Sequence, residues 1–98
     1  MNMQQMIIQA QKIQREMQKQ HAELEKKEFI ISKSGAVTVV VMGDKSIKSV
    51  SIDADAMDPD NKEMVEDLIA LAINEAIDQI KAEEEKINSQ LSGAGKLF

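Results

Sequence analysis

Apolar residues in the first third of the chain recur at a seven-residue spacing. Residues 1–27 contain no Gly or Pro and are rich in Gln, Lys, Glu and Met, which are good helix formers. A narrow apolar seam at this spacing is typical of a helix that packs against another helix. The pattern therefore predicts one long helix over residues 1–27. Two seam positions carry its apolar residues: Met3, Ala10, Met17 and Leu24 at one, Met6 and Ile13 at the other.

The hydrophobic period then changes to that of strands. Three short runs are dense in β-branched residues: 28–34, 36–42 and 46–52. Turn residues separate them, at Gly35 and at residues 43–45, so the runs predict a three-stranded antiparallel meander. The spacing from Ile47 to Val50 breaks the alternation of the third run, which predicts a bulge at that point.

A second long helix is predicted after an acidic corner. Asp58 followed by Pro59 fits a helix cap with proline at the first helical position, and the apolar pattern continues to about Leu91. Between Met64 and Ile80 the apolar residues span a wide arc, which has to be covered on more than one side. The expected architecture is therefore α+β: long helix, meander, long helix.

The length of the chain, 98 residues, suits one small domain, which we assign to residues 1–91, with a flexible tail over residues 92–98. The two helices would be about 40 Å and 45 Å long, whereas a compact chain of this size has a radius of gyration near 13 Å. Their ends should overhang the sheet, and a symmetric homodimer would cover them. We expect its interface on the wide arc of the second helix, at Leu68, Ile69, Ala72, Ala76 and Ile80.

Composition excludes several classes of enzyme. The chain has seven Met, two Phe, one His and no Cys, Tyr or Trp, so thiolate chemistry, disulfides and Cys- or His-rich metal sites are not expected. The absence of Cys suits a reducing cytoplasm. No apolar run approaches the roughly 18 residues of a membrane span. The aspartates at residues 53–60 lack the Gly and Glu of a calcium loop and are explained as caps. We expect no enzyme, metal, cofactor or small-molecule substrate.

Charge gives a mixed indication. With 17 acids against 12 bases the net charge is −5, which argues against a nucleic-acid-binding protein. Residues 1–34, however, hold six bases against four acids. Four of these bases form one stripe on the helical wheel opposite the apolar seam: Lys12, Arg15, Lys19 and Lys26. The stripe, about 21 Å long, would suit a phosphate backbone. The alternative is a solvated face laced by local ion pairs with Glu16 and Glu23.

Four segments together resemble a known family. They are the Gln-, Lys- and Met-rich residues 9–18, the Val-rich strand 36–43 that ends in Gly, the Val-Ser-Ile-Asp of residues 50–53, and residues 62–76 with their Glu-Asp-Leu core and Asn-Glu-Ala ending. Over nearly the whole chain, the sequence resembles the YbaB/EbfC family of bacterial nucleoid-associated proteins. It departs from that family in its acidic balance and in a tail that lacks Pro, Gly and Met richness.

The resemblance implies an intertwined, tweezer-like homodimer whose paired sheets form a body and whose helices project as arms. It also implies non-enzymatic binding of double-stranded DNA through the arms, in the nucleoid of the bacterial cytoplasm. Together with the basic stripe, it favours Lys12, Arg15, Lys19 and Lys26 as phosphate contacts. The competing interpretation is a dimeric scaffold whose acidic surface docks a basic protein partner and which has little affinity for DNA.

Overall fold

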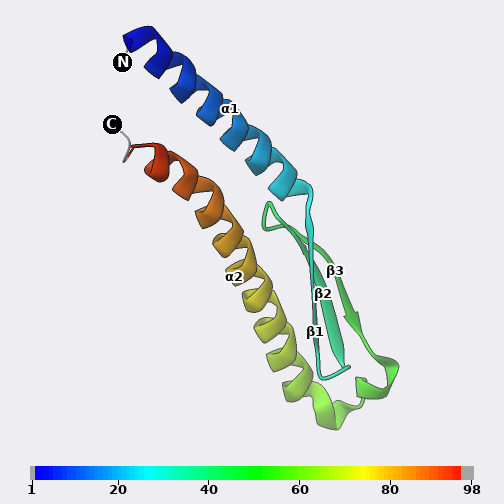
Figure 1. The fold of residues 1–98 in the computed structure, drawn as a ribbon. Helices are drawn as coiled ribbons and strands as arrows, with labels where there is room; N and C mark the ends of the chain where they lie inside the picture. The colour runs from blue at the N-terminus through cyan, green and yellow to red at the C-terminus, as the bar shows by residue number, and fades with distance from the viewer. Residues whose placement is uncertain (1, 96–98) are drawn as a thin grey trace.

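The chain forms two long helices and a small sheet, arranged along one axis (Figure 1). The computed structural model describes residues 2–95, and it describes the side chains as far as residue 90. The order of elements is the predicted one, and α+β is confirmed. The elements are α1 (Met3–Lys26), β1 (Glu28–Lys33), β2 (Val37–Met42), β3 (Ile47–Ile52), two 3-10 helices (Ala54–Ala56 and Pro59–Asn61) and α2 (Lys62–Gly95).

The first helix begins at a side-chain cap and is anchored only near its end. The Gln4 backbone N–H donates to Asn2 Oδ1 (3.0 Å), which satisfies one of the free donors of the first turn. Leu24 is the only buried residue of α1. Along the predicted seam, Met6, Ile13 and Met17 are half-buried, whereas Met3 and Ala10 are exposed. The seam is therefore used mainly in its second half.

The three strands form an antiparallel sheet in the order β1-β2-β3, as predicted. Lys33 pairs with Val37, and the Ala36 backbone N–H donates to the Lys33 carbonyl oxygen (3.0 Å) across a turn in which Ser34 (φ 55) and Gly35 (φ 63) both have positive φ. Turns of this kind match the right-handed twist of the strands. Between β2 and β3, Val40 pairs with Ser49 and Val41 with Ile47, so Lys48 is an extra residue. The predicted bulge is confirmed.

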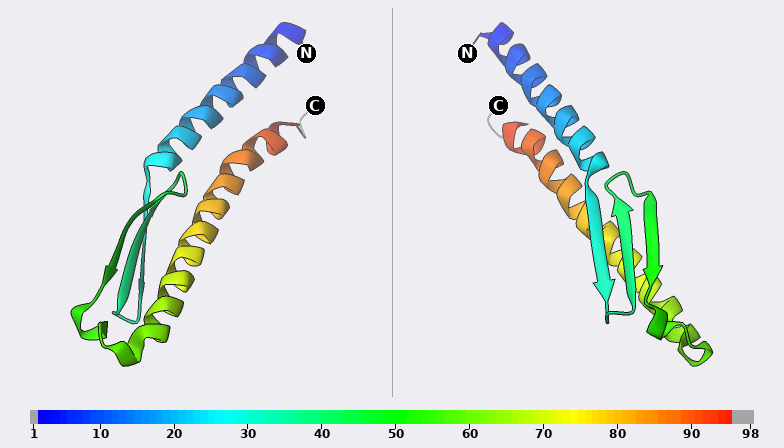
Figure 2. Two further views of the ribbon diagram at one scale, coloured as in Figure 1. Left: turned by 180° about the vertical axis from the view of Figure 1, so that it is seen from behind. Right: turned by 90° about the vertical axis from the view of Figure 1, so that its right-hand side faces the viewer.

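The core lies between α2 and the first two strands. One face of the sheet presents Phe29, Ile31, Val37, Val39 and Val41, all buried. Small residues of α2 let the helix lie close to these strands, and larger ones close the layer on either side. The buried residues of α2 are Val65, Ala72, Ala76, Ile80 and Ile87. Figure 2 shows the sheet lying along the first half of α2, with α1 beside its second half.

Three of the five residues expected at a homodimer interface are buried in this core. Ala72, Ala76 and Ile80 are 0% exposed because they pack against the chain's own sheet, so they have no free surface to offer a partner. Leu68 and Ile69 are half-buried and pack against the edge of the core. The chain's own sheet covers the centre of the wide arc of α2, and the cover expected on a second side stays a prediction.

The second helix also runs further than expected. α2 continues to Gly95, so residues 92–95, predicted as part of a flexible tail, are helical; the remaining tail, residues 96–98, lies outside the described residues. No proline interrupts the Ser-Gly-Ala-Gly sequence, and a glycine costs only about 1 kcal/mol in a helix that is already nucleated. At the other end, Asp58 and Pro59 do cap a helix, but a 3-10 helix that leads into α2 at Lys62.

Candidate nucleic-acid interface

Four basic side chains lie along the exposed surface of α1, with Lys12 at its edge, where it lines a hollow together with Gln90 of α2. Lys12, Arg15, Lys19 and Lys26 are all exposed. The half-buried seam residues Ile13 and Met17 lie on the opposite side of the helix, where they pack toward α2. The structure therefore places the four predicted residues together as one stripe, which we call the basic stripe.

The basic stripe forms no ion pair among the described residues. The ion pairs there use other bases: Lys27–Glu83 (3.2 Å), Lys33–Glu75 (2.5 Å), Lys45–Glu84 (3.2 Å), Lys62–Glu66 (3.3 Å) and Lys48–Glu28. The local pairs with Glu16 and Glu23 that a solvated face would use are not formed. The four charges are thus free to meet an anionic partner.

Two of the acidic side chains that could repel an anionic partner are held in ion pairs. Glu83 lies 3.2 Å from Lys27, next to the end of α1, and Glu84 lies 3.2 Å from Lys45 in the turn between β2 and β3. Each pair partly neutralises the acidic second half of α2. Sequence spacing could not reveal these pairs, because their partners are 56 and 39 positions apart in the chain.

A polar clasp fixes α1 against α2. Gln90 Nε2 donates to Gln20 Oε1 (2.9 Å), and Gln20 Nε2 donates to Gln90 Oε1 (3.3 Å). At the next residue of α1, a ring nitrogen of His21 lies 3.1 Å from Asn88 Oδ1. Gln20 occupies a seam position and His21 is its neighbour, so these residues join the two helices. The clasp holds the basic stripe in a defined orientation relative to α2.

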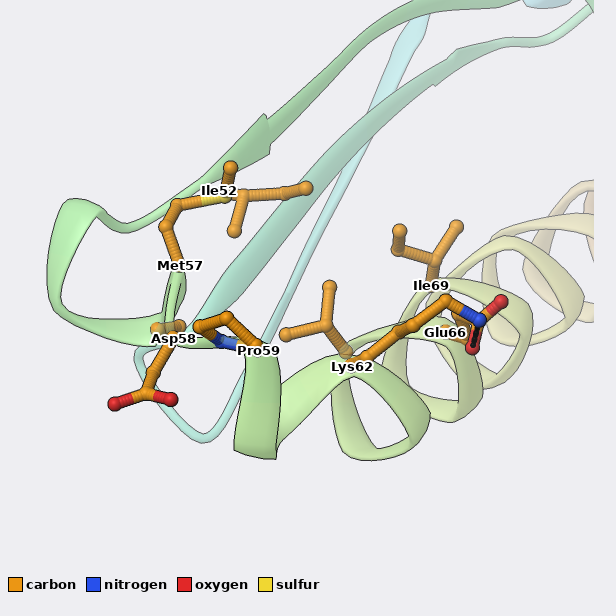
Figure 3. A pocket seen from close by; sticks show the side chains of 9 residues that line it. Ile52, Met57, Asp58, Pro59, Lys62, Glu66 and Ile69 are labelled. Carbon is orange, nitrogen blue, oxygen red and sulfur yellow. Dashed lines mark hydrogen bonds and ion pairs between the residues drawn. The ribbon is translucent and has the colours of Figure 1, made fainter.

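A second feature of the surface is apolar. A cavity of about 390 Å³ opens between the end of β3 and the start of α2 (Figure 3). Ile52, Met57, Pro59, Val65 and Ile69 supply most of its wall. Asp58, Lys62 and Glu66 stand at its rim. The cavity lacks converging polar groups of the kind that would bind a polar metabolite, so it suits an apolar occupant.

The acidic residues of the turns serve the backbone. Asp53 and Asp58 each accept a hydrogen bond from the backbone N–H two residues on, at 2.9 Å. Asp44 accepts from the Ser46 hydroxyl and backbone N–H, and these hydrogen bonds lower the pKa of its carboxyl. Among the described residues, no three His, Cys, Asp or Glu side chains gather closely enough to hold a metal ion. The same residues include no helix long and apolar enough to cross a membrane.

Comparison with known proteins shows the family of this chain. A model of the YbaB/EbfC DNA-binding family matches residues 1–95. A nucleoid-associated protein of Clostridium novyi is 46% identical over 98 residues, which cover 99% of this chain and 84% of the relative. Another nucleoid-associated protein, from Metamycoplasma arthritidis, is 40% identical over 92 residues, which cover 94% of this chain and 96% of the relative. Because the family model and both relatives span nearly the whole chain, the chain belongs to the YbaB/EbfC DNA-binding family.

Proposed function

We propose that this protein is a non-enzymatic, nucleoid-associated DNA-binding protein that acts as a homodimer. It binds double-stranded DNA mainly through phosphate contacts from Lys12, Arg15, Lys19 and Lys26. The observation that carries the proposal is the contrast between this basic stripe and the bases of the sheet and turns. The four stripe residues are exposed and without ion pairs among the described residues, whereas Lys33, Lys45 and Lys48 are each held by a carboxylate.

Membership of the YbaB/EbfC family supports DNA as the partner and the bacterial nucleoid as the location. A net charge of −5 does not oppose this, because phosphate binding depends on the local field and distant charges are screened. At physiological salt the screening length is about 8 Å. The acids at the start of α2, Glu63, Glu66 and Asp67, therefore have little influence on phosphates held at α1.

The homodimer is supported by an uncovered apolar surface. Ile47, Val50 and Ile52 of β3 pair directly with buried residues of β2, so they point to the helix side of the sheet. α2 covers β1 and β2, and Ile47 and Val50 remain 51% and 43% exposed. Ile69, Ile73 and Ile77 follow one another at four-residue spacing along α2 and are half-buried. We call these six residues the apolar groove.

A second copy of this chain is the occupant that we propose for the apolar groove. The single chain measures 69 × 21 × 15 Å and has a radius of gyration of 19.6 Å, against about 13 Å for a compact chain of this size. So extended a shape leaves little buried core for each residue, and a partner would add to it. Of the five interface residues expected from the sequence, Leu68 and Ile69 remain candidates in this proposal.

The direct test is a mobility-shift titration with random-sequence duplex DNA at two salt concentrations. The triple variant Lys12→Glu, Lys19→Glu and Lys26→Glu should weaken binding to all sequences alike and make the slope of log affinity against log salt shallower. A matched control reverses Lys45, Lys48 and Lys62, which changes the net charge equally but lies on the body and the start of α2; it should have a much smaller effect.

Two results would contradict the proposal. No binding by the wild-type protein at about 50 mM salt, where phosphate contacts are strong, would exclude DNA as the partner. Equal affinity of the wild-type protein and the triple variant would remove the basic stripe from the interface. In either case the scaffold interpretation, with acidic surfaces docking a basic protein, would take precedence.

A further inference from the structure

Uncharged amides cover the face of α1 next to the basic stripe. Gln11, Gln14 and Gln18 line a shallow hollow together with Arg15. Their spacing of three and four residues places them on one side of the helix. All four side chains are exposed. We call Gln11, Gln14, Arg15 and Gln18 the amide patch.

The polar groups of the amide patch are not used by the fold. Within residues 2–90, none of its side chains takes part in a hydrogen bond or ion pair. Gln20, by contrast, exchanges two hydrogen bonds with Gln90 across the two helices. Each free amide offers two donors and an acceptor oxygen, and the guanidinium offers five donors in a planar fork. These groups are available to a ligand with edges that both donate and accept.

The amide patch and the lysines form parallel lines on the helix. Lys12, Lys19 and Lys26 follow one another at seven-residue spacing, and so do Gln4, Gln11 and Gln18. Gln11 and Gln18 come one position before Lys12 and Lys19, whereas Glu25 precedes Lys26. Residues seven apart lie almost above one another on a helix, so each set forms a line along its axis. Arg15 lies between the two lines on the wheel. A cationic line and an amide line thus run along the helix about 100° apart around its axis.

We propose that α1 enters the major groove of DNA and that the amide patch reads bases there. This inference rests on the proposed function, in which α1 is the element that contacts DNA. An α-helix about 10–12 Å across fits a major groove about 12 Å wide. Gln presents the bidentate pattern that matches adenine N6 and N7, and Arg15 the one that matches guanine O6 and N7. Lys12, Lys19 and Lys26 hold the phosphates at the groove edge.

The size of the patch sets the length of DNA that one chain reads. Gln11 and Gln18 are seven residues apart, which corresponds to about 10 Å along the helix axis. Base pairs stack about 3.4 Å apart, so one copy covers about three base pairs. The preferred sequence should contain adenines next to a guanine, because three of the four reading side chains are Gln and one is Arg. Phosphate contacts alone would give no such preference.

The experiment is a selection from a random duplex library with the wild-type protein, followed by titration of the selected duplex and a scrambled version. Wild type should enrich a short sequence of adenines beside a guanine, and should bind it about 5- to 150-fold more tightly than the scrambled duplex, the range for one good bidentate contact. The variant Gln14→Ala with Gln18→Ala should lose the preference for adenine and keep its affinity for the scrambled duplex.

The matched control is Gln5→Ala with Gln9→Ala, two exposed glutamines of α1 that lie outside the amide patch. It should select the same sequence as wild type, and both variants should keep their helix content because Ala is the best helix former. Uniform binding of all duplexes by wild type would overturn the base-reading inference and leave the proposed function standing. An unchanged adenine preference in the variant Gln14→Ala with Gln18→Ala would also overturn the base-reading inference. If wild type bound no duplex at all, both proposals would fail.

Discussion

A single missing side chain lets the sheet dock on the first helix. A Cβ atom built on Gly43 would lie 1.7 Å from the carbonyl oxygen of Leu24 and 2.5 Å from its carbonyl carbon. The Gly43 backbone N–H also donates to the Lys27 carbonyl oxygen at 2.9 Å. Gly43 therefore joins the β2–β3 turn to the end of α1, and no other residue fits without moving backbone.

Gly43→Ala should destabilise the protein strongly. Crowding against a side chain can be relieved by a rotamer change, but here the obstacle is a helix carbonyl, so we expect the upper part of the range for overpacking, about 3 kcal/mol. Gly35→Ala is the control: its Cβ would meet nothing within 4 Å, and only the positive φ of 63° costs energy, about 1–2 kcal/mol. Urea unfolding at one fixed protein concentration measures both. Equal losses would contradict the docking role of Gly43.

The sequence predicts Gly43 as a turn residue but not its close approach to Leu24, because that approach depends on where α1 ends relative to the sheet. The cap at Asp58 and the bulge at Lys48 were predicted, since both depend on residues adjacent in the chain. The ion pairs Lys27–Glu83 and Lys45–Glu84 were not predicted, since their partners are far apart in the chain and meet only after folding. At the scale of residues, local chemistry could be read and long-range contacts could not.

At the scale of elements, α1 is attached to the body through a short segment near its end. Leu24 is its only buried residue, Gly43 and Lys27 hold its last turn, and the clasp of Gln20 with Gln90 lies one turn earlier. Met3, Ile7 and Ile8 in the first two turns are 52–76% exposed. The N-terminal half of α1 therefore has little support from the rest of the chain as far as the side chains are described, although it carries Lys12. Arg15 lies just beyond it.

Leu24→Ala should loosen α1 while the sheet stays folded. A buried Leu replaced by Ala costs about 2–5 kcal/mol, and here the cost falls on the docking of one helix. Hydrogen exchange should show faster exchange across residues 3–26, with the strands still protected by their packing on α2. Ile7→Ala is the control, since Ile7 is 52% exposed and should change exchange little. Uniform loss of protection in all elements would instead mean that α1 and the sheet unfold together.

The type and order of the elements followed from hydrophobic period alone, because the helix and strand patterns here are strong and turn residues separate them. The hydrophobic period did not show what packs against the apolar face of each element. The arc of α2 is apolar over Ala72, Ala76 and Ile80 whether the chain's own sheet or a partner covers it, and the structure assigns these three to the sheet. A period identifies an apolar face but does not say what packs against it.

At the scale of the whole molecule, the apolar groove predicts assembly. Sedimentation equilibrium at micromolar concentration should give twice the 10.9 kDa of one chain. Val50→Asp with Ile73→Asp should produce a folded monomer, because a charge in an interface costs several kcal/mol, whereas both side chains retain solvent access in the single chain. Ile30→Asp is the control, since Ile30 is 61% exposed on the opposite face of the sheet. Dissociation by Ile30→Asp alone would move the interface to that face.

The position of the acids relative to DNA is also a property of the whole molecule. Replacing Glu83, Glu84 and Glu85 by Gln removes three negative charges beside α1 and releases Lys27 and Lys45 from their ion pairs. DNA binding should therefore strengthen, and its salt dependence should steepen, because more cations can meet phosphates. Far-ultraviolet circular dichroism should hardly change, since exposed ion pairs contribute about 0–1 kcal/mol each.

The matched control separates local from overall charge. Glu63→Gln, Glu66→Gln and Asp67→Asn remove the same number of charges at the opposite end of α2, beyond the sheet (Figure 1). If only the field near α1 matters, this variant should bind DNA as wild type does at 0.15 M salt, where screening acts over about 8 Å. Equal strengthening by both variants would show that net charge governs affinity. Strengthening by the control alone would place DNA at the sheet end of the molecule, because only charges near the phosphates escape screening.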